Sequence, residues 1–88
     1  MLQPVLEKQF IKDIKQATKR RKDLQKLNDI INALLQEQLL PQKNKNHKLQ
    51  GEYKDHWECH IQPDWLLIYR KTSTELILVR TGSHSDLF

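Results

Sequence analysis

Histidines are concentrated in the second half of this 88-residue sequence. Three of the four fall in different predicted elements, so the fold could bring them together at one site. An imidazole has an ordinary pKa of about 6.5, which lets it accept or donate a proton near neutral pH. Histidines are also common on protein surfaces, so one of them alone indicates no function. The four histidines are His47, His56, His60 and His84.

An arginine lies shortly before the last histidine. Arg80 closes an apolar stretch, and Gly82 and His84 follow it. A guanidinium group in this position can bind an oxyanion through two parallel hydrogen bonds. The structural alternative is a salt bridge at the edge of a sheet with Glu58 or Asp64. The first interpretation predicts an oxyanion site beside His84.

The spacing of the residues disfavours metal ligation and cofactor chemistry. The stretch from His56 to Gln62 alternates between polar and apolar residues, which predicts a strand with Cys59 on the opposite face from His56 and His60. Cys59 is the only cysteine, so neither an internal disulfide nor a CxxC pair can form. The two glycines form no phosphate-binding loop and no Gly-x-Ser-x-Gly elbow. We expect no metal and no cofactor.

Length and charge predict one small basic domain over residues 1–88. Fifteen Lys and Arg against 11 Asp and Glu give a net charge of +4 and a pI of about 9.3. Hydrophobic residues make up 38%, so the core is modest and a bound partner would add stability. The N-terminus has no apolar signal region, and the longest apolar run, Trp65 to Tyr69, is far shorter than the roughly 20 residues that span a bilayer. We expect a cytoplasmic protein that does not enter a membrane.

The elements that must position these residues divide the chain into a helical half and a strand half. Apolar spacing predicts helices over residues 7–21 and 24–35, the second of them capped by Asp23. A surface loop over 41–55 follows, and Gly82 permits a sharp exit into the tail over 83–88. Strands are predicted over residues 2–6 (an edge strand), 56–62, 65–69 and 75–81. The predicted fold class is α+β, with an N-terminal αα-hairpin packed on one face of a small antiparallel β-sheet and the other face open for function.

A basic stripe runs along the first predicted helix and into the turn after it. Its lysines recur at helical spacing on the side opposite the apolar residues. Such a stripe fits the phosphate backbone of a nucleic acid, and it equally fits the solvated outer face of a helix. The candidate contacts with RNA are Lys12, Lys15, Lys19, Arg20, Arg21 and Lys22.

Three segments carry a resemblance to a known family. They are the loop His47-Lys48-Leu49-Gln50-Gly51, the run from Cys59 to Tyr69 with its His-x-x-Pro-Asp-Trp turn, and the ending from Arg80 to Phe88. Their order and spacing resemble the YafQ branch of the RelE/ParE toxin superfamily. The resemblance implies that superfamily's fold and the toxin of a type II toxin–antitoxin system. It further implies a ribosome-dependent endoribonuclease (mRNA interferase) that cleaves mRNA in the ribosomal A site and inhibits translation, with a cognate antitoxin that we expect to be acidic and co-encoded.

The resemblance also implies the site residues. RNA can be cut without a metal when its own 2′-OH attacks the adjacent phosphate, which requires a proton acceptor, a proton donor and charge stabilisation. We expect His84 as the general acid toward the leaving 5′-oxygen, and His60 or His47 as the base toward the 2′-OH. Asp64 would orient or tune an imidazole, or only cap the turn before Trp65. The motif positions carried over are His47, His60, Asp64, Arg80, His84 and Phe88.

Two residues are expected at the substrate, and two rival functions stay open. Phe88 would contact the substrate nucleotide, whereas Trp65 would line the pocket or belong to the core. One rival is a non-catalytic toxin of the ParE branch that binds DNA gyrase, and the other is a small basic RNA-binding module. The histidines together with Asp64 and Arg80 favour RNA cleavage, because a binding surface needs no acid–base groups.

Overall fold

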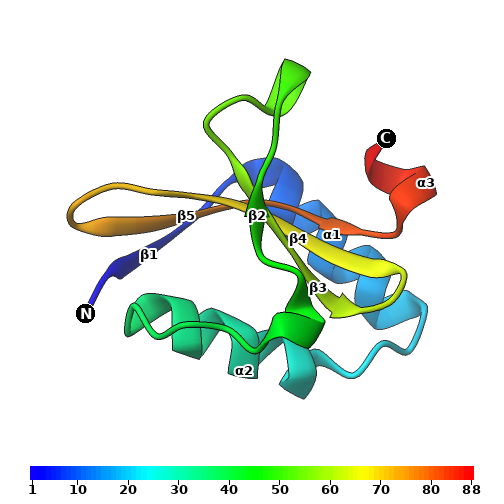
Figure 1. Cartoon of the computed structure of the whole chain (residues 1–88). Helices are drawn as coiled ribbons and strands as arrows, with labels where there is room; N and C mark the ends of the chain where they lie inside the picture. The colour runs from blue at the N-terminus through cyan, green and yellow to red at the C-terminus, as the bar shows by residue number, and fades with distance from the viewer.

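The computed structural model describes residues 1–88 and contains a five-stranded sheet with two long helices on one side (Figure 1). In chain order the elements are β1 (Gln3–Leu6), α1 (Lys8–Lys19), α2 (Leu24–Leu35), the 3-10 turn η1 (Gln42–Asn44), β2 (His47–Lys48), the 3-10 turn η2 (Gly51–Tyr53), β3 (Trp57–Gln62), β4 (Trp65–Lys71), β5 (Glu75–Gly82) and α3 (His84–Leu87). This arrangement confirms the predicted α+β class.

The strands lie in the order β1-β5-β4-β3-β2. Strands β3, β4 and β5 form the predicted antiparallel meander, and β1 is the predicted edge strand, where Pro4 is tolerated because one side of the backbone is unpaired. However, β1 runs parallel to β5, with Val5 opposite Ile77. The sheet is therefore mixed, and the prediction of a wholly antiparallel sheet is wrong in this pairing. The residue pattern of a strand does not specify the direction of a partner at the other end of the sequence.

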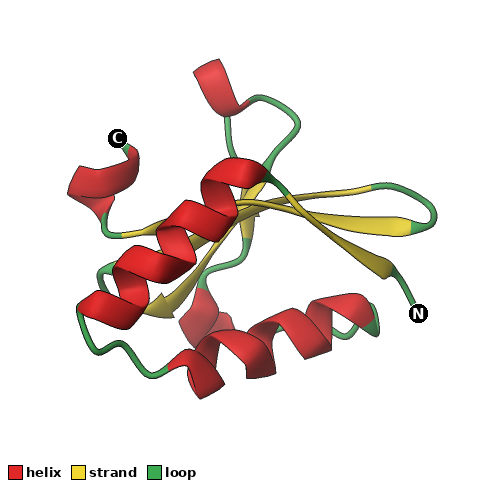
Figure 2. Ribbon diagram, turned by 180° about the vertical axis from the view of Figure 1, so that it is seen from behind, coloured by secondary structure: helices red, strands yellow, loops and turns green.

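Helices α1 and α2 follow one another through a short turn and cover the same face of the sheet (Figure 2). Helix α1 buries Phe10, Asp13 and Ala17 at helical spacing and packs along β5. Helix α2 begins at its predicted cap, where the Asp23 carboxylate accepts a hydrogen bond from the Gln25 backbone N–H at 3.0 Å, and it lies beside β3. The two predicted helices thus lie over different strands of the sheet. None of the helices has the length and apolar composition needed to cross a lipid bilayer.

The main core fills the space between these helices and the sheet. Trp65 and Tyr69 from β4 and Phe10 from α1 are at most 2% exposed there. Cys59 also belongs to this core, and burial raises the pKa of its thiol to about 12. Its position agrees with the predicted alternation of β3, which turns His60 to the opposite face.

The opposite face of the sheet carries a smaller apolar cluster and is only partly covered. Leu87 of α3 packs there with Leu66 and Ile68 of β4. The sequence predicted a tail after Gly82 without assigning it secondary structure, and this segment forms the short helix α3. A capping box fixes its first turn, because Ser83 and Asp86 each accept a hydrogen bond from the other's backbone N–H. The uncovered part of this face holds the candidate site.

Candidate active site

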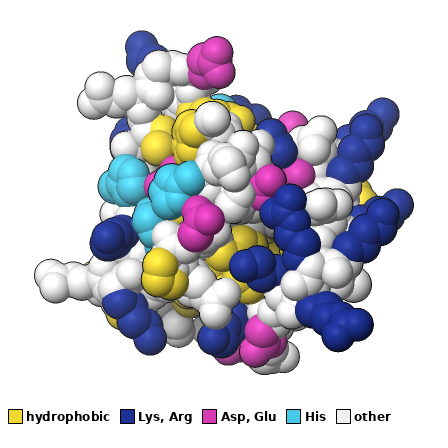
Figure 3. Space-filling model, turned by 90° about the vertical axis from the view of Figure 1, so that its right-hand side faces the viewer, with side chains coloured by type: hydrophobic (Ala, Val, Ile, Leu, Met, Phe, Trp, Pro, Cys, Tyr) yellow, Lys and Arg dark blue, Asp and Glu magenta, His cyan; other side chains and the backbone are white.

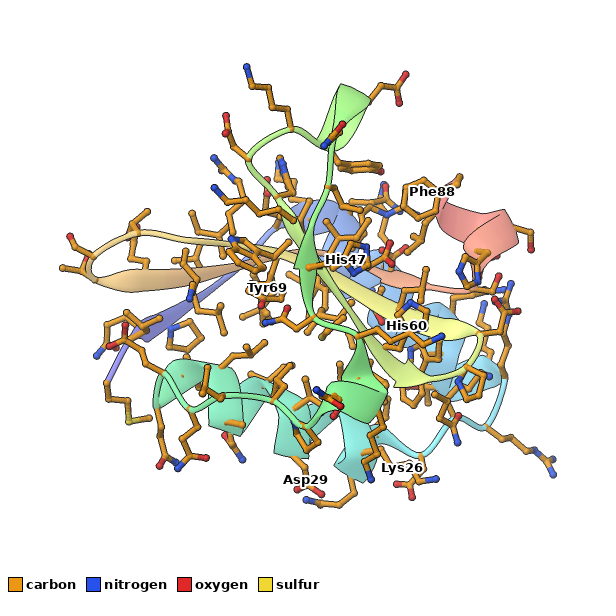
Figure 4. The ribbon with its side chains drawn as sticks, in the orientation of Figure 1. Lys26, Asp29, His47, His60, Tyr69 and Phe88 are labelled. Atoms are coloured by element: carbon orange, nitrogen blue, oxygen red, sulfur yellow. The ribbon has the colours of Figure 1, made fainter.

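Two of the predicted histidines meet at one carboxylate. His47 of β2 pairs across the sheet with Glu58 of β3, and the period of two along β3 places His60 on the same face. The Nε2 atoms of His47 and His60 lie 3.6 and 3.3 Å from Oε1 of Glu58 (Figure 4). Glu58 is only 5% exposed, and its carboxylate can hold the charge of either imidazole when that imidazole takes up a proton. The sequence suggested Glu58 only as a possible salt-bridge partner of Arg80, although its position between His56 and His60 was the available signal.

A second pair joins the turn after β3 to the start of α3. Oδ1 of Asp64 accepts a hydrogen bond from the backbone N–H of His84 at 2.9 Å and lies 2.7 Å from His84 Nδ1. These two hydrogen bonds, the backbone one first, lower the pKa of Asp64. An ionised Asp64 accepts a hydrogen bond from Nδ1–H of His84, which leaves Nε2 as the ring nitrogen that Asp64 does not bind. Asp64 therefore contacts both the backbone and the imidazole of His84.

The two pairs form one group. The rings of His60 and His84 lie 5.7 Å apart between centroids and are inclined by 67°, so they are in edge contact. The space-filling view shows the histidine side chains gathered on one side of the molecule (Figure 3). The fold therefore brings together His47, His60, Asp64 and His84, while His56, directly before β3, lies against Tyr53.

Arg80 has a different partner from those that the sequence offered. Its Nε and Nη2 donate hydrogen bonds to the two oxygens of Asp13 at 2.8 and 3.2 Å, whereas the predicted alternative was a pair with Glu58 or Asp64. Asp13 also accepts a hydrogen bond from the backbone N–H of Thr81. Thr81 lies in the part of β5 beyond Leu78, where β1 no longer pairs with it. The hydrogen bond to Asp13 is the main cause that raises the pKa of Arg80. A lone acidic residue on the apolar face of helix 7–21 was the signal in the sequence.

The two expected substrate contacts are placed differently. Phe88 is 62% exposed, and its ring meets the ring of Tyr53 edge to face, with 5.7 Å between centroids. Trp65 is 1% exposed, and its indole N–H donates to Thr81 Oγ1 at 3.0 Å in the interior. The structure thus favours the core role for Trp65 and leaves Phe88 open to a ligand.

The basic residues of α1 and its turn are mostly exposed. Arg20 is exposed as well, but it is held in an ion pair in which it donates two hydrogen bonds to Asp86 of α3. Lys22 lies over the buried ring of Trp65, 5.8 Å from its centroid. Four side chains stand free in solvent on this surface: Lys12, Lys15, Lys19 and Arg21.

Two hollows flank these groups. One, of about 290 Å³, lies beside His60 and is edged by Lys43 and Lys45 of the loop around η1. The other, of about 200 Å³, lies between α1, the end of β5 and α3. It is lined by Arg20 and Arg80, each of which is bound to its own aspartate. Of these two hollows, only the first is lined by a histidine, His60. No three His, Cys, Asp or Glu side chains converge in a way that could hold a metal ion.

Comparison with known proteins identifies the class to which this fold and site belong. Residues 2–88 match a family described as the bacterial toxin of type II toxin–antitoxin systems, YafQ. The match covers both the helical half and the strands that carry the histidines. The chain belongs to the YafQ toxin family.

Individual relatives are similar over almost the whole chain. The mRNA interferase toxin YafQ of Escherichia coli (strain K12) is 44% identical over 81 residues, which cover 91% of this chain and 88% of that protein. A chain of the E. coli DinJ-YafQ toxin–antitoxin complex aligns with a TM-score of 0.92 and 40% identity, over 99% of this chain and 97% of that one. A metal-bound toxin from Helicobacter pylori aligns with a TM-score of 0.93 and 44% identity, over the full length of both.

Proposed function

We propose that this protein is an mRNA interferase that cleaves messenger RNA in the ribosomal A site and thereby inhibits translation. Its place of action is the cytoplasm, where the ribosomes work. The observation that carries the proposal is the edge contact between His60 and His84, the latter held by Asp64 through two hydrogen bonds. The E. coli relative is named an mRNA interferase toxin, which supports the same substrate class.

The reaction requires no group beyond the RNA and the side chains. The 2′-oxygen of the nucleotide 5′ to the cleavage site attacks the phosphorus, and its proton passes to a base. The bond from phosphorus to the 5′-oxygen breaks, and that oxygen takes a proton from Nε2 of His84. The products are a 2′,3′-cyclic phosphate and a free 5′-hydroxyl. Acid and base catalysis of this kind contributes about 10²- to 10⁴-fold each in rate.

His60 is the base in this proposal, because its ring contacts His84 and a single phosphate can reach both. Glu58, 3.3 Å away, stabilises the imidazolium ion that forms when His60 takes the proton. His47 lies on the other side of the same carboxylate and is half exposed, so it helps to hold Glu58 in place and contacts the RNA from β2. Of the two bases that the sequence left open, His60 is thus the base in this proposal and His47 is a supporting residue.

Arg80 supplies positive charge for the phosphate oxygens. Asp13 engages Nε and Nη2 of the guanidinium, which leaves the Nη1 donors for an oxyanion. A cation whose position is fixed before the substrate binds needs little rearrangement when charge develops in the transition state.

The exposed basic residues provide contacts outside the reacting group. Lys43 and Lys45 edge the hollow beside His60 and bind phosphates of the message, while the free cations of α1 rest on ribosomal RNA. A chain related to this one forms the DinJ-YafQ complex, so we also propose a co-encoded acidic antitoxin as partner. A partner that binds only the folded toxin raises its melting temperature, and an unchanged midpoint at saturating antitoxin would contradict this.

Cleavage of a defined message tests the proposal. Cut sites are first mapped on a pool of ribosome-bound messages, and one site is then remade with a single 2′-deoxy nucleotide 5′ to the cleaved bond. We expect the all-ribose message to be cut and the deoxy message to resist, with toxin pretreated with EDTA and the ribosomal magnesium maintained. Equal cleavage of both would indicate an activated water. No cleavage of either message, together with tight binding to DNA gyrase, would favour the ParE-like function.

A further inference from the structure

An aromatic side chain outside the predicted motif positions lies on the same face as the histidines. Tyr53 ends the 3-10 turn η2, which starts at Gly51 with a φ of +74° that suits glycine. The ring of Tyr53 lies 5.7 Å from that of Phe88 at an angle of 79°, and 5.6 Å from that of His56 at 76°. Figure 3 shows hydrophobic side chains directly beside the histidine group.

Phe88 connects Tyr53 to the residue proposed as the acid. Phe88 follows His84 by one turn of α3, and its backbone N–H donates to the His84 carbonyl at 2.9 Å. Tyr53 also adds to the rise in the pKa of Arg80, of which the hydrogen bond to Asp13 is the main cause. The ring of Tyr53 is thus joined to the proposed acid through Phe88.

The geometry of the two rings suits a flat ligand. Phe88 is 62% exposed, although it is a large hydrophobic residue that could have packed inward. Two rings that are nearly perpendicular form a corner, in which a planar group stacks on one ring and meets the other edge to face. Nucleobases are planar, and stacking on an aromatic residue does not depend on which base is present.

We propose that Tyr53 and Phe88 form an aromatic corner that binds the nucleobase on the 3′ side of the cleaved bond. This side is assigned because Phe88 is adjacent to His84, which gives its proton to the 5′-oxygen of that nucleotide. The ligand class is an unpaired nucleobase of RNA, held by stacking, and Tyr53 takes part in binding rather than in proton transfer. The inference rests on the proposed function and adds a binding subsite to it.

Variants at both positions separate stacking from packing. Tyr53→Leu keeps apolar bulk in the cluster with Leu66 and Ile68 but removes the ring, whereas Tyr53→Phe keeps the ring and removes only the hydroxyl. We expect Tyr53→Leu to raise KM for ribosome-bound message about tenfold with a much smaller change in kcat, and Tyr53→Phe to lose clearly less. Phe88→Leu tests the same corner at an exposed position where folding is not at risk. Leu39→Ser, at a side chain that is 98% exposed and outside the cluster of Tyr53 with Leu66 and Ile68, is the matched control for lost apolar surface.

A base-free substrate completes the test. An abasic nucleotide on the 3′ side should weaken binding to the parental protein as much as Tyr53→Leu does, and it should add little in that variant. If the abasic change costs the parental protein and Tyr53→Leu equally, or if Tyr53→Phe loses as much as Tyr53→Leu, the corner is wrong and the hydroxyl or the packing is what matters.

A second readout does not depend on cleavage. A 2-aminopurine at the same position of a non-cleavable 2′-deoxy message should lose fluorescence with the parental protein and with Tyr53→Phe, and not with Tyr53→Leu. Quenching without any cleavage of ribose message would overturn the proposed nuclease and leave the base-binding corner standing. Cleavage without this quenching would do the reverse.

Discussion

Arg20, directly after α1, binds Asp86 of α3 through two hydrogen bonds of 2.5 and 3.1 Å. Asp86 also accepts the backbone N–H of Ser83 at 2.9 Å, so one carboxylate joins the first helix to the cap of the last. His84 lies inside that turn. The ion pair therefore links the helical half of the molecule to the position of the proposed general acid.

The first prediction concerns this ion pair and pH. The hydrogen bond with Arg20 lowers the pKa of Asp86 below the ordinary carboxyl value of about 3.9. A carboxylate with a lowered pKa in the folded state stabilises the fold above that ordinary value, and the stabilisation is lost as the pH falls further. We expect Asp86→Asn to lower Tm by a few degrees at pH 7 and the difference from the parental protein to shrink below about pH 4. Arg21→Gln, at the next and unpaired arginine, should leave Tm unchanged; an equal loss there would show that general charge is responsible.

The second prediction concerns Asp64. Asp64→Asn keeps the size of the side chain but removes the charge that holds the Nδ1 proton of His84, so cleavage should fall about tenfold or more. His84→Ala should cost more, about 10²- to 10⁴-fold. Because Asp64 acts through His84, the double variant should be no slower than His84→Ala alone. Multiplied losses would mean an independent role for Asp64. The control is Asp55→Asn, at an exposed position whose φ of +69° asparagine tolerates.

The third prediction separates the two consequences of losing Arg80. Arg80→Ala removes the proposed phosphate contact and also leaves Asp13, which is 9% exposed, without its cation. We expect a lower Tm together with a loss of cleavage of about 10²-fold or more. Adding Asp13→Asn should restore much of the Tm and none of the activity. Recovery of both would show that Arg80 acts only by supporting the fold.

The fourth prediction concerns the carboxylate between the histidines. Glu58→Gln keeps the shape of the side chain and removes its charge, so the imidazolium ion formed during the reaction loses its partner. We expect kcat to fall about tenfold or more while KM changes little, measured in single-turnover cleavage on the ribosome. Glu52→Gln, at an exposed position of η2, should behave as the parental protein does. A change confined to KM would assign Glu58 to binding instead.

The fifth prediction concerns the exposed lysines of α1. Replacing Lys12, Lys15 and Lys19 by Gln should weaken association with ribosomes, and it should make that association less sensitive to salt, because fewer counterions are released. Tm should stay the same, since these side chains form no ion pair in the fold. Lys26→Gln on α2 is the control. An unchanged salt dependence would mean that this surface is only solvated.

Sequence patterns predicted the features that depend on local periodicity. The alternation in β3 placed His60 and Cys59 on opposite faces, and Asp23 was found as the cap of α2. The motif positions His47, His60, Asp64 and His84 indeed lie together. A local pattern does not show which residues far along the chain will form ion pairs with one another. The pair of Asp13 with Arg80 joins residues 67 positions apart, and that of Arg20 with Asp86 joins residues 66 apart.

The parallel pairing of β1 with β5 has a consequence for biosynthesis. Strand β1 is made before β5 and has no partner in the sheet until residues 75–78 have been added, because Gln3 pairs with Glu75 and Leu6 with Leu78. Contacts between segments so far apart in the chain make folding slow, because the long loop between them must close first. The five-stranded sheet is therefore complete only after β5 has been made, and His84 follows β5 in the chain. A nascent chain that ends before β5 does not yet contain the proposed site.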